Sequence, residues 1–135
     1  MLVENIMSEH VHCVLPDVTL ADLRNIFKTV PYHHLLVARD AELLGVVSDR
    51  DVLRMSSPYL DTDQASAQDE CLLHTKVQDF MSTKLITVKK DTLIDAAAIL
   101  LMEHDISCLP VVSKDHMVEG ILTWKDMLQY YVYVQ

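Results

Sequence analysis

Glycine is scarce in this chain, whose 135 residues contain only Gly45 and Gly120. Average usage of about 7% would supply roughly nine glycines. Cysteine is also rare: Cys13, Cys71 and Cys108 are odd in number, lie far apart and form no C-x-x-C pair. This pattern favours reduced thiols in a cytoplasmic protein over a disulfide framework.

Basic residues are outnumbered, since 11 Lys and Arg face 20 Asp and Glu for a formal net charge of −9. Such a chain repels nucleic acid on average, whereas a small phosphorylated ligand depends on local donors. No apolar stretch approaches the ~20 residues that span a bilayer. Residues 1–5 lack the basic start and apolar run of a signal peptide. We therefore expect a cytoplasmic protein with neither a nucleic-acid nor a membrane partner.

Two copies of one pattern run along the chain, and both glycines fall at the same place in it. The matched segments are residues 3–8 with 77–82, residues 35–37 with 109–111, and residues 45–48 with 120–123. Between the copies, Ser-Ser-Pro and an acidic polar run mark a connector. We predict a first repeat over residues 1–55, a connector over 56–75 and a second repeat over 76–135.

Each copy has the pattern strand–helix–strand–strand–helix, which predicts an α+β fold made of two βαββα repeats. Short apolar strands are expected at 11–15 and 85–88. Each leads to a threonine, Thr19 or Thr92, that precedes an aspartate by three residues, as at a capped helix start. Apolar hairpins follow at 35–47 and 109–122. The last helix of each copy should open at Ser48 or Thr123, and Pro58 should end the first of them. A short helix is possible within 65–73.

One heptapeptide pattern stands twice, as Gly45-Val46-Val47-Ser48-Asp49-Arg50-Asp51 and as Gly120-Ile121-Leu122-Thr123-Trp124-Lys125-Asp126. A Leu-Pro-Val-Val segment precedes the second hairpin at 109–112, and the first copy has Leu-Leu-Val-Ala at 35–38. With these motifs the chain resembles tandem cystathionine-β-synthase-type (CBS) repeats. It is similar in particular to short stand-alone CBS-pair proteins of the acetoin-utilisation type.

The resemblance implies that the repeats pack by their sheets about a pseudo-twofold axis into one domain with two clefts. It also implies a regulatory role without catalysis, in which AMP, ADP, ATP or an S-adenosyl compound binds in the clefts. Relatives often form dimers and regulate a partner protein, so a homodimer and a regulated partner are expected here.

The heptapeptide supplies a hydroxyl, a cation and a carboxylate at a strand-to-helix junction. These groups are Ser48, Arg50 and Asp51 in the first copy and Thr123, Lys125 and Asp126 in the second. A helix N-terminus with a hydroxyl and a cation suits a phosphate. A carboxylate can accept two hydrogen bonds, which a ribose diol supplies, and the resemblance gives this aspartate that role. The same Ser/Thr-x-x-Asp arrangement is also an ordinary helix cap.

Adenine needs a flat apolar slot, and position in the repeat makes several side chains candidates to line it. They are His12, Tyr32, His33, Ile86 and Ile106, with Met7 and Met81 at the rim. The alternative for most of them is a place in the hydrophobic core.

Histidines of the first copy suggest a metal-responsive sensor as an alternative, because imidazole binds zinc, nickel and copper. His10 and His12 could share one face of a strand, and His33 with His34 precedes the next strand. No Cys pair or H-x-x-x-H helix accompanies them, so we expect no metal and no required cofactor. Cys108 has no acid or base set beside it by spacing, and we expect no enzyme activity. A further alternative is a ligand-free dimerisation or scaffold module.

Overall fold

The computed structural model describes residues 1–134, which form two compact units. Unit 1 contains Met1–His12, Asp40–Leu43 and the described residues that follow Lys84. Unit 2 contains Cys13–Arg39 and Leu44–Lys84. Each unit therefore combines segments from both sequence repeats.

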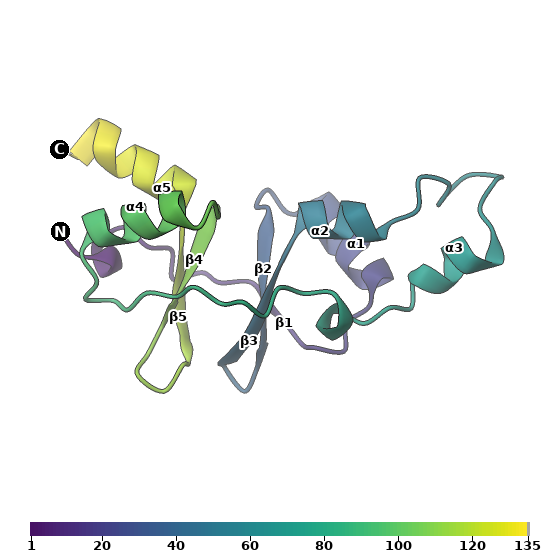
Figure 1. The fold of residues 1–135 in the computed structure, drawn as a ribbon, viewed down its shortest axis with the longest axis horizontal. Helices are drawn as coiled ribbons and strands as arrows, with labels where there is room; N and C mark the ends of the chain where they lie inside the picture. The colour runs from purple at the N-terminus through teal and green to yellow at the C-terminus, as the bar shows by residue number, and fades with distance from the viewer. Residues whose placement is uncertain (135) are drawn as a thin grey trace. The chain divides into compact units, whose positions relative to one another are not determined.

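Unit 2 is built on the hairpin of the first repeat (Figure 1). Its elements are β1 (Cys13–Val14), α1 (Leu20–Thr29), β2 (His34–Arg39), β3 (Glu42–Ser48), α2 (Asp49–Met55), α3 (Ala67–Leu72) and a 3-10 turn (Val77–Asp79); the first two residues of β3 are counted with unit 1. The sheet has the order β1-β2-β3, and β1 runs parallel to β2. Leu20 and Leu23 of α1 are buried against Leu35 and Val37 of β2 and form the centre of its core.

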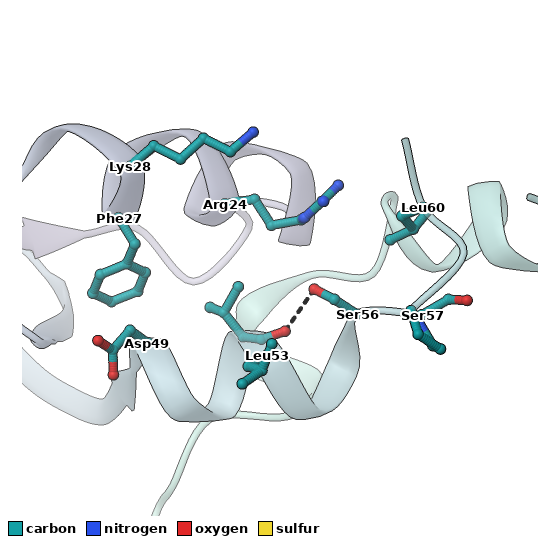
Figure 2. A pocket seen from close by; sticks show the side chains of 10 residues that line it. Arg24, Phe27, Lys28, Asp49, Leu53, Ser56, Ser57 and Leu60 are labelled. Atoms are coloured by element: carbon teal, nitrogen blue, oxygen red, sulfur yellow. Dashed lines mark hydrogen bonds between the residues drawn. The ribbon is translucent and has the colours of Figure 1, made fainter. Parts of the chain in front are cut away.

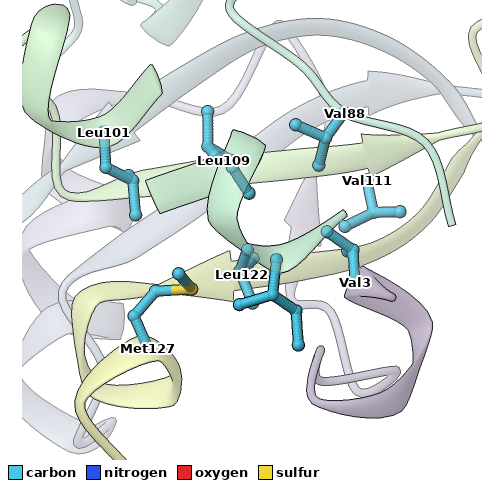
Figure 3. Close-up of a cluster of buried hydrophobic side chains, with 9 residues drawn as sticks. Val3, Val88, Leu101, Leu109, Val111, Leu122 and Met127 are labelled. Atoms are coloured by element: carbon cyan, nitrogen blue, oxygen red, sulfur yellow. The ribbon is translucent and has the colours of Figure 1, made fainter. Parts of the chain in front are cut away.

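Unit 1 repeats this plan around the second hairpin. Its elements are a 3-10 turn (Val3–Asn5), α4 (Ile94–Glu103), β4 (Cys108–Val112), β5 (Val118–Thr123), α5 (Trp124–Gln129) and a π-helical turn (Tyr130–Val134). Strands β4 and β5 are antiparallel, with Leu109 opposite Leu122. Figure 3 shows Leu101 of α4 and Met127 of α5 in the same buried cluster as these two leucines. Helices α4 and α5 thus close one hydrophobic core.

The N-terminal segment of each repeat packs on the hairpin of the other repeat. In unit 1, Ser8 pairs with Ile121 of β5, and its N–H donates to the Ile121 carbonyl at 2.9 Å. In unit 2, Ser82 pairs in the same way with Val46 of β3. The predicted division into residues 1–55, 56–75 and 76–135 follows the order of the repeats along the chain. Each compact unit combines segments of both repeats, so the units do not test this division, and it stays a prediction.

The predicted hairpins and the final helix of each copy are confirmed. Helices α2 and α5 begin immediately after Ser48 and Thr123, which are their N-caps. Helix α2 ends at Met55, before Pro58, and α3 lies within the segment where a short helix was possible. The capped start at Thr19 is also confirmed, since its hydroxyl accepts the Asp22 N–H at 3.3 Å.

The predicted strand over residues 85–88 is wrong, because only Val88 makes a parallel bridge there, with Val111. Val88 donates to the Pro110 carbonyl at 3.1 Å and accepts from the Val112 N–H at 3.0 Å. The next rung toward Ile86 would need an N–H from residue 110, and proline has none. The proline of the Leu-Pro-Val-Val segment therefore ends this ladder.

The predicted cap at Thr92 is also wrong. Helix α4 has Leu93 as its N-cap, and no side chain caps it. The Thr92 hydroxyl instead accepts the Lys89 N–H at 3.0 Å in the preceding turn. Helix α4 thus begins one residue later than the Thr-x-x-Asp pattern suggests.

No helix within residues 1–134 has the length and apolar character needed to cross a bilayer.

Candidate functional site

The heptapeptide of the first repeat forms the junction between β3 and α2. Ser48 Oγ accepts the Asp51 N–H at 3.1 Å, and Asp51 Oδ2 accepts the Ser48 N–H at 2.9 Å. These two bonds satisfy donors that a helix N-terminus would otherwise leave without partners. The capping interpretation of Ser48 and Asp51 is therefore confirmed. The predicted contact with a ribose stays a prediction.

The second repeat builds the same junction between β5 and α5. Asp126 Oδ2 accepts the Thr123 N–H at 2.9 Å and lies 3.1 Å from the Thr123 hydroxyl. Both aspartates are partly buried, so each carboxylate is held near the surface in one orientation. Arg50 and Lys125, the predicted cations, are exposed on the first turn of their helices.

The two aspartates differ at their second oxygen. Asp51 Oδ1 lies 2.6 Å from Arg54 Nη2, in an ion pair within α2. Asp126 Oδ1 has no hydrogen-bond partner among residues 1–134. Asp126 thus keeps one oxygen without a hydrogen-bond partner among the described residues, whereas each oxygen of Asp51 already accepts one hydrogen bond.

A loop approaches each junction within its own unit, and this contact was not predicted. In unit 2, His33 Nδ1 lies 2.7 Å from Asp49 Oδ2, and the His33 carbonyl accepts the Asp49 N–H at 3.0 Å. In unit 1, Trp124 Nε1 donates to the Ile106 carbonyl at 3.0 Å. The predicted adenine residues His33 and Ile106 therefore lie beside the helix starts. The anchors Asp49 and Trp124 occupy the variable positions of the motif, which is why the sequence pattern did not reveal them.

The remaining adenine candidates divide between core and surface. Met7, Ile86 and Ile106 pack, partly buried, against the core of unit 1, and Met81 packs against that of unit 2. These four side chains therefore contact the core, and their contact with adenine stays a prediction. Tyr32 belongs to unit 2 and is exposed, whereas His12 belongs to unit 1 and is half-buried.

The glycines of the motif mark places where another chain segment lies very close. An added Cβ at Gly120 would lie 2.8 Å from Met7 Sδ and 2.8 Å from the Ser8 carbonyl oxygen. At Gly45 it would collide with the Met81 side chain. The two rim methionines are thus packed directly onto the two glycines.

The histidines do not form a metal centre with other ligands. Within the part of the chain that the structure describes, no three His, Cys, Asp or Glu side chains gather closely enough to hold an ion. Burial lowers the pKa of His34, and the nearby Asp49 only partly opposes this shift. His34 is therefore less readily protonated than an ordinary imidazole, which makes it a poorer cation for a phosphate.

A separate groove of about 610 Å³ lies in unit 2 between α1, α2 and residues 56–60 (Figure 2). Phe27 and Leu53 are among its apolar lining residues, and Arg24 and Lys28 lie along α1 above it. Arg24 is paired with Asp61 at 2.8 Å. None of the predicted nucleotide-binding residues lines this groove.

Comparison with known proteins identifies the repeats. Residues 3–57 and 77–133 each match the CBS domain. The chain belongs to the CBS domain family. A CBS domain-containing protein of Dictyostelium discoideum is 28% identical over 95% of this chain and 89% of its own length.

Solved CBS-pair structures share the fold across the whole chain. The acetoin utilization protein AcuB from Vibrio cholerae superposes with a TM-score of 0.80 and 28% identity, over 99% of this chain and 92% of that protein. The structure of CBSX2 in complex with AMP gives a TM-score of 0.82 at 27% identity, over 98% and 97% of the two chains. The two-repeat α+β fold is therefore confirmed.

Other relatives are longer proteins. The chain spans 40% of protein MJ1225 of Methanocaldococcus jannaschii, to which it is 25% identical. It spans 24% of a homoserine O-acetyltransferase of Methanococcus vannielii, to which it is 26% identical. CBS repeats thus occur both in short proteins and as parts of larger ones that include enzymes.

Proposed function

We propose that this CBS pair is a non-catalytic regulatory module that binds an adenine nucleotide or an S-adenosyl compound and signals to a partner protein. The carboxylate of Asp126 carries the proposal. Its Oδ2 is engaged in the helix cap, while its Oδ1 is available in a partly buried position beside the Ile106 loop. A ribose hydroxyl is a suitable donor for that oxygen, and the AMP complex of CBSX2 supports an adenine ligand.

The surrounding groups suit the rest of a nucleotide. Thr123 contributes a hydroxyl and Lys125 an exposed cation for a phosphate, and Ser48 and Arg50 are their counterparts in the first repeat. The apolar side chains of Met7, Ile86 and Ile106 lie in the same unit as Asp126.

Titration calorimetry of the wild type and of Asp126→Ala, Asp51→Ala and the double variant tests the proposal. The ligands are AMP, ADP, ATP and S-adenosylmethionine. Loss of charge-assisted hydrogen bonds should weaken binding about ten- to a hundredfold, and more for Asp126→Ala than for Asp51→Ala.

Asp22→Ala is the matched control for the loss of a cap. Asp22 Oδ2 accepts the Thr19 N–H at 3.1 Å in a capping box of the same form, outside the heptapeptide. This variant should lose a similar amount of stability and keep its ligand affinity. If the double variant binds as tightly as the wild type, the site is wrongly assigned. If the wild type binds none of the four ligands at millimolar concentration, the scaffold alternative replaces this proposal.

We also propose that the module forms a homodimer through the outer face of α4, α5 and the π-helical turn that follows α5. Four apolar side chains are strongly exposed there: Ile99 by 53%, Met102 by 68%, Leu128 by 58% and Val132 by 65%. The equivalent positions of the first repeat hold Asn25, Lys28, Leu53 and Ser57, of which three are polar. The fold therefore does not require apolar residues on this face, and exposed apolar patches mark interaction sites.

Light scattering tests the dimer. The wild type at micromolar concentration should give about twice the 15.4 kDa chain mass. Leu128→Lys should shift it toward the monomer, whereas Leu53→Lys, at the equivalent position of the other repeat, should not. A wild-type monomer, or equal effects of the two lysines, would contradict this interface.

A further inference from the structure

The ion pair between Arg54 and Asp51 makes the two repeats unequal as ligand sites. We infer that Arg54 is a specificity-determining residue that lowers the affinity of the first-repeat aspartate for a ribose diol, so that the second-repeat aspartate takes the ligand first. This inference rests on the proposed function and concerns the order and selectivity of binding.

The two aspartates differ in how many of their carboxylate oxygens already accept a hydrogen bond. Asp51 uses Oδ2 for the Ser48 N–H at 2.9 Å and Oδ1 for Arg54 Nη2 at 2.6 Å. Both carboxylate oxygens are therefore already engaged. Asp126 uses Oδ2 alone, and its Oδ1 has no partner within residues 1–134.

The two aspartates also differ in the charge beside them. The Arg54 guanidinium offsets the negative charge of the carboxylate that a ribose hydroxyl would approach, and hydrogen bonds gain strength from the charge of the acceptor. The position of the second repeat that corresponds to Arg54 is Gln129, which carries no charge. Asp126 therefore keeps its full charge as well as a free oxygen.

The solvent exposure of the ion pair limits the effect of Arg54 on affinity. The side chain of Arg54 is 72% exposed and that of Asp51 is 24% exposed, so water screens the pair. Exposed ion pairs contribute little, and breaking this one should change affinity by about two- to fivefold. Arg54 thus lowers the affinity of the first site relative to the second without abolishing binding at the first.

The test isolates one site at a time. In an Asp126→Ala background only the first-repeat aspartate remains, and adenosine is titrated into this protein with and without Arg54→Gln. Adenosine has no phosphate, so the loss of a cation cannot weaken a phosphate contact. Arg54→Gln should tighten adenosine binding about two- to fivefold.

Two controls separate this effect from a general change of charge or fold. Lys28→Gln removes an exposed cation from the neighbouring helix α1 but not from the ion pair, and it should not tighten adenosine binding. The ligand 2′,3′-dideoxyadenosine lacks both ribose hydroxyls, so Arg54→Gln should leave its affinity for the Asp126→Ala protein unchanged. The reciprocal variant Gln129→Arg, in an Asp51→Ala background, should weaken adenosine binding by a similar factor.

The outcomes are distinct. Unchanged or weaker adenosine binding by Arg54→Gln overturns the inference and leaves the proposed function intact. An equal gain in affinity for adenosine and for the dideoxy analogue also overturns it, because the effect of Arg54 would then not depend on the ribose hydroxyls. If neither adenosine nor AMP binds the wild type or any variant at millimolar concentration, the proposed function fails and this inference fails with it.

Discussion

Replacing Gly120 by alanine should destabilise the protein more than the same change at Gly45, although both glycines occupy one place in the motif. The new Cβ at position 120 would lie 2.8 Å from the Ser8 carbonyl oxygen. That oxygen accepts the Ile121 N–H at 3.0 Å, and the Ser8 N–H donates back to Ile121 at 2.9 Å. The backbone at Ser8 is thus held by two hydrogen bonds and cannot move without loosening them.

The contact at Gly45 is of another kind. The nearest atoms to an added Cβ there all belong to the side chain of Met81, with Cγ at 2.8 Å and Cε at 3.1 Å. Methionine is unbranched and has three rotatable bonds, so it can turn aside. Overpacking costs about 1–3 kcal/mol. We expect about 2 kcal/mol for Gly120→Ala and below about 1 kcal/mol for Gly45→Ala.

Urea unfolding followed by circular dichroism measures both losses at one protein concentration. For a chain of this length, 1 kcal/mol corresponds to roughly 4 °C in Tm, so thermal melts should separate the variants by several degrees. A second substitution in each variant makes the test more specific. Adding Met81→Ala to Gly45→Ala should recover part of the lost free energy of unfolding, whereas adding Met7→Ala to Gly120→Ala should recover little of it. Equal losses, or a larger loss at Gly45, would refute the distinction between backbone and side-chain contacts.

Three further predictions concern local structure. Thr123→Ala should lower the free energy of unfolding by about 0.5–2 kcal/mol because it removes the α5 cap. Thr92 caps no helix, so Thr92→Ala should lower the free energy of unfolding less in the same urea titration. The hydrogen bond from Tyr131 to Asp95, at 2.6 Å, raises the pKa of Tyr131 from 10.0 to about 12. This hydrogen bond therefore contributes its full stabilisation of the fold below pH 10, and the contribution is lost as pH rises toward 12. Tyr131→Phe should flatten the dependence of the free energy of unfolding on pH in this range. Ala41 has a φ of 68° in the β2–β3 turn; Ala41→Gly should raise Tm, and an unchanged or lower value would contradict strain at this turn.

The repeat, the hairpins and the capped starts of α2 and α5 could be predicted from the sequence because each depends on residues close together in the chain. A Ser/Thr-x-x-Asp pattern specifies its own hydrogen bonds, as Ser48 with Asp51 shows. The same pattern failed at Thr92, where the turn after Lys89 competes for the hydroxyl. Local signals are therefore reliable only where no neighbouring backbone donor uses the same oxygen.

The exchange of N-terminal segments could not be predicted, because it depends on pairing between residues far apart in the sequence. Nothing in residues 3–8 indicates that Ser8 bonds to Ile121 instead of to the hairpin of its own repeat. The equivalent positions of the two glycines are evident in the sequence, but the reason for glycine there, the close approach of Met7 and Met81, is visible only in the packing. The shortened strand near Val88 follows from a proline in a different strand.

The aspartate of the motif can serve fold and ligand together because its two oxygens are separable. Oδ2 faces the helix end in both repeats and completes the capping box, so it contributes to stability whether or not a ligand is present. Oδ1 contributes nothing to the cap, and its surroundings can vary without loss of the helix start. Arg54 and Gln129 show such variation within one chain, since their helices begin with the same hydrogen bonds. A pair of repeats can therefore keep one fold while the surroundings of its two aspartates differ.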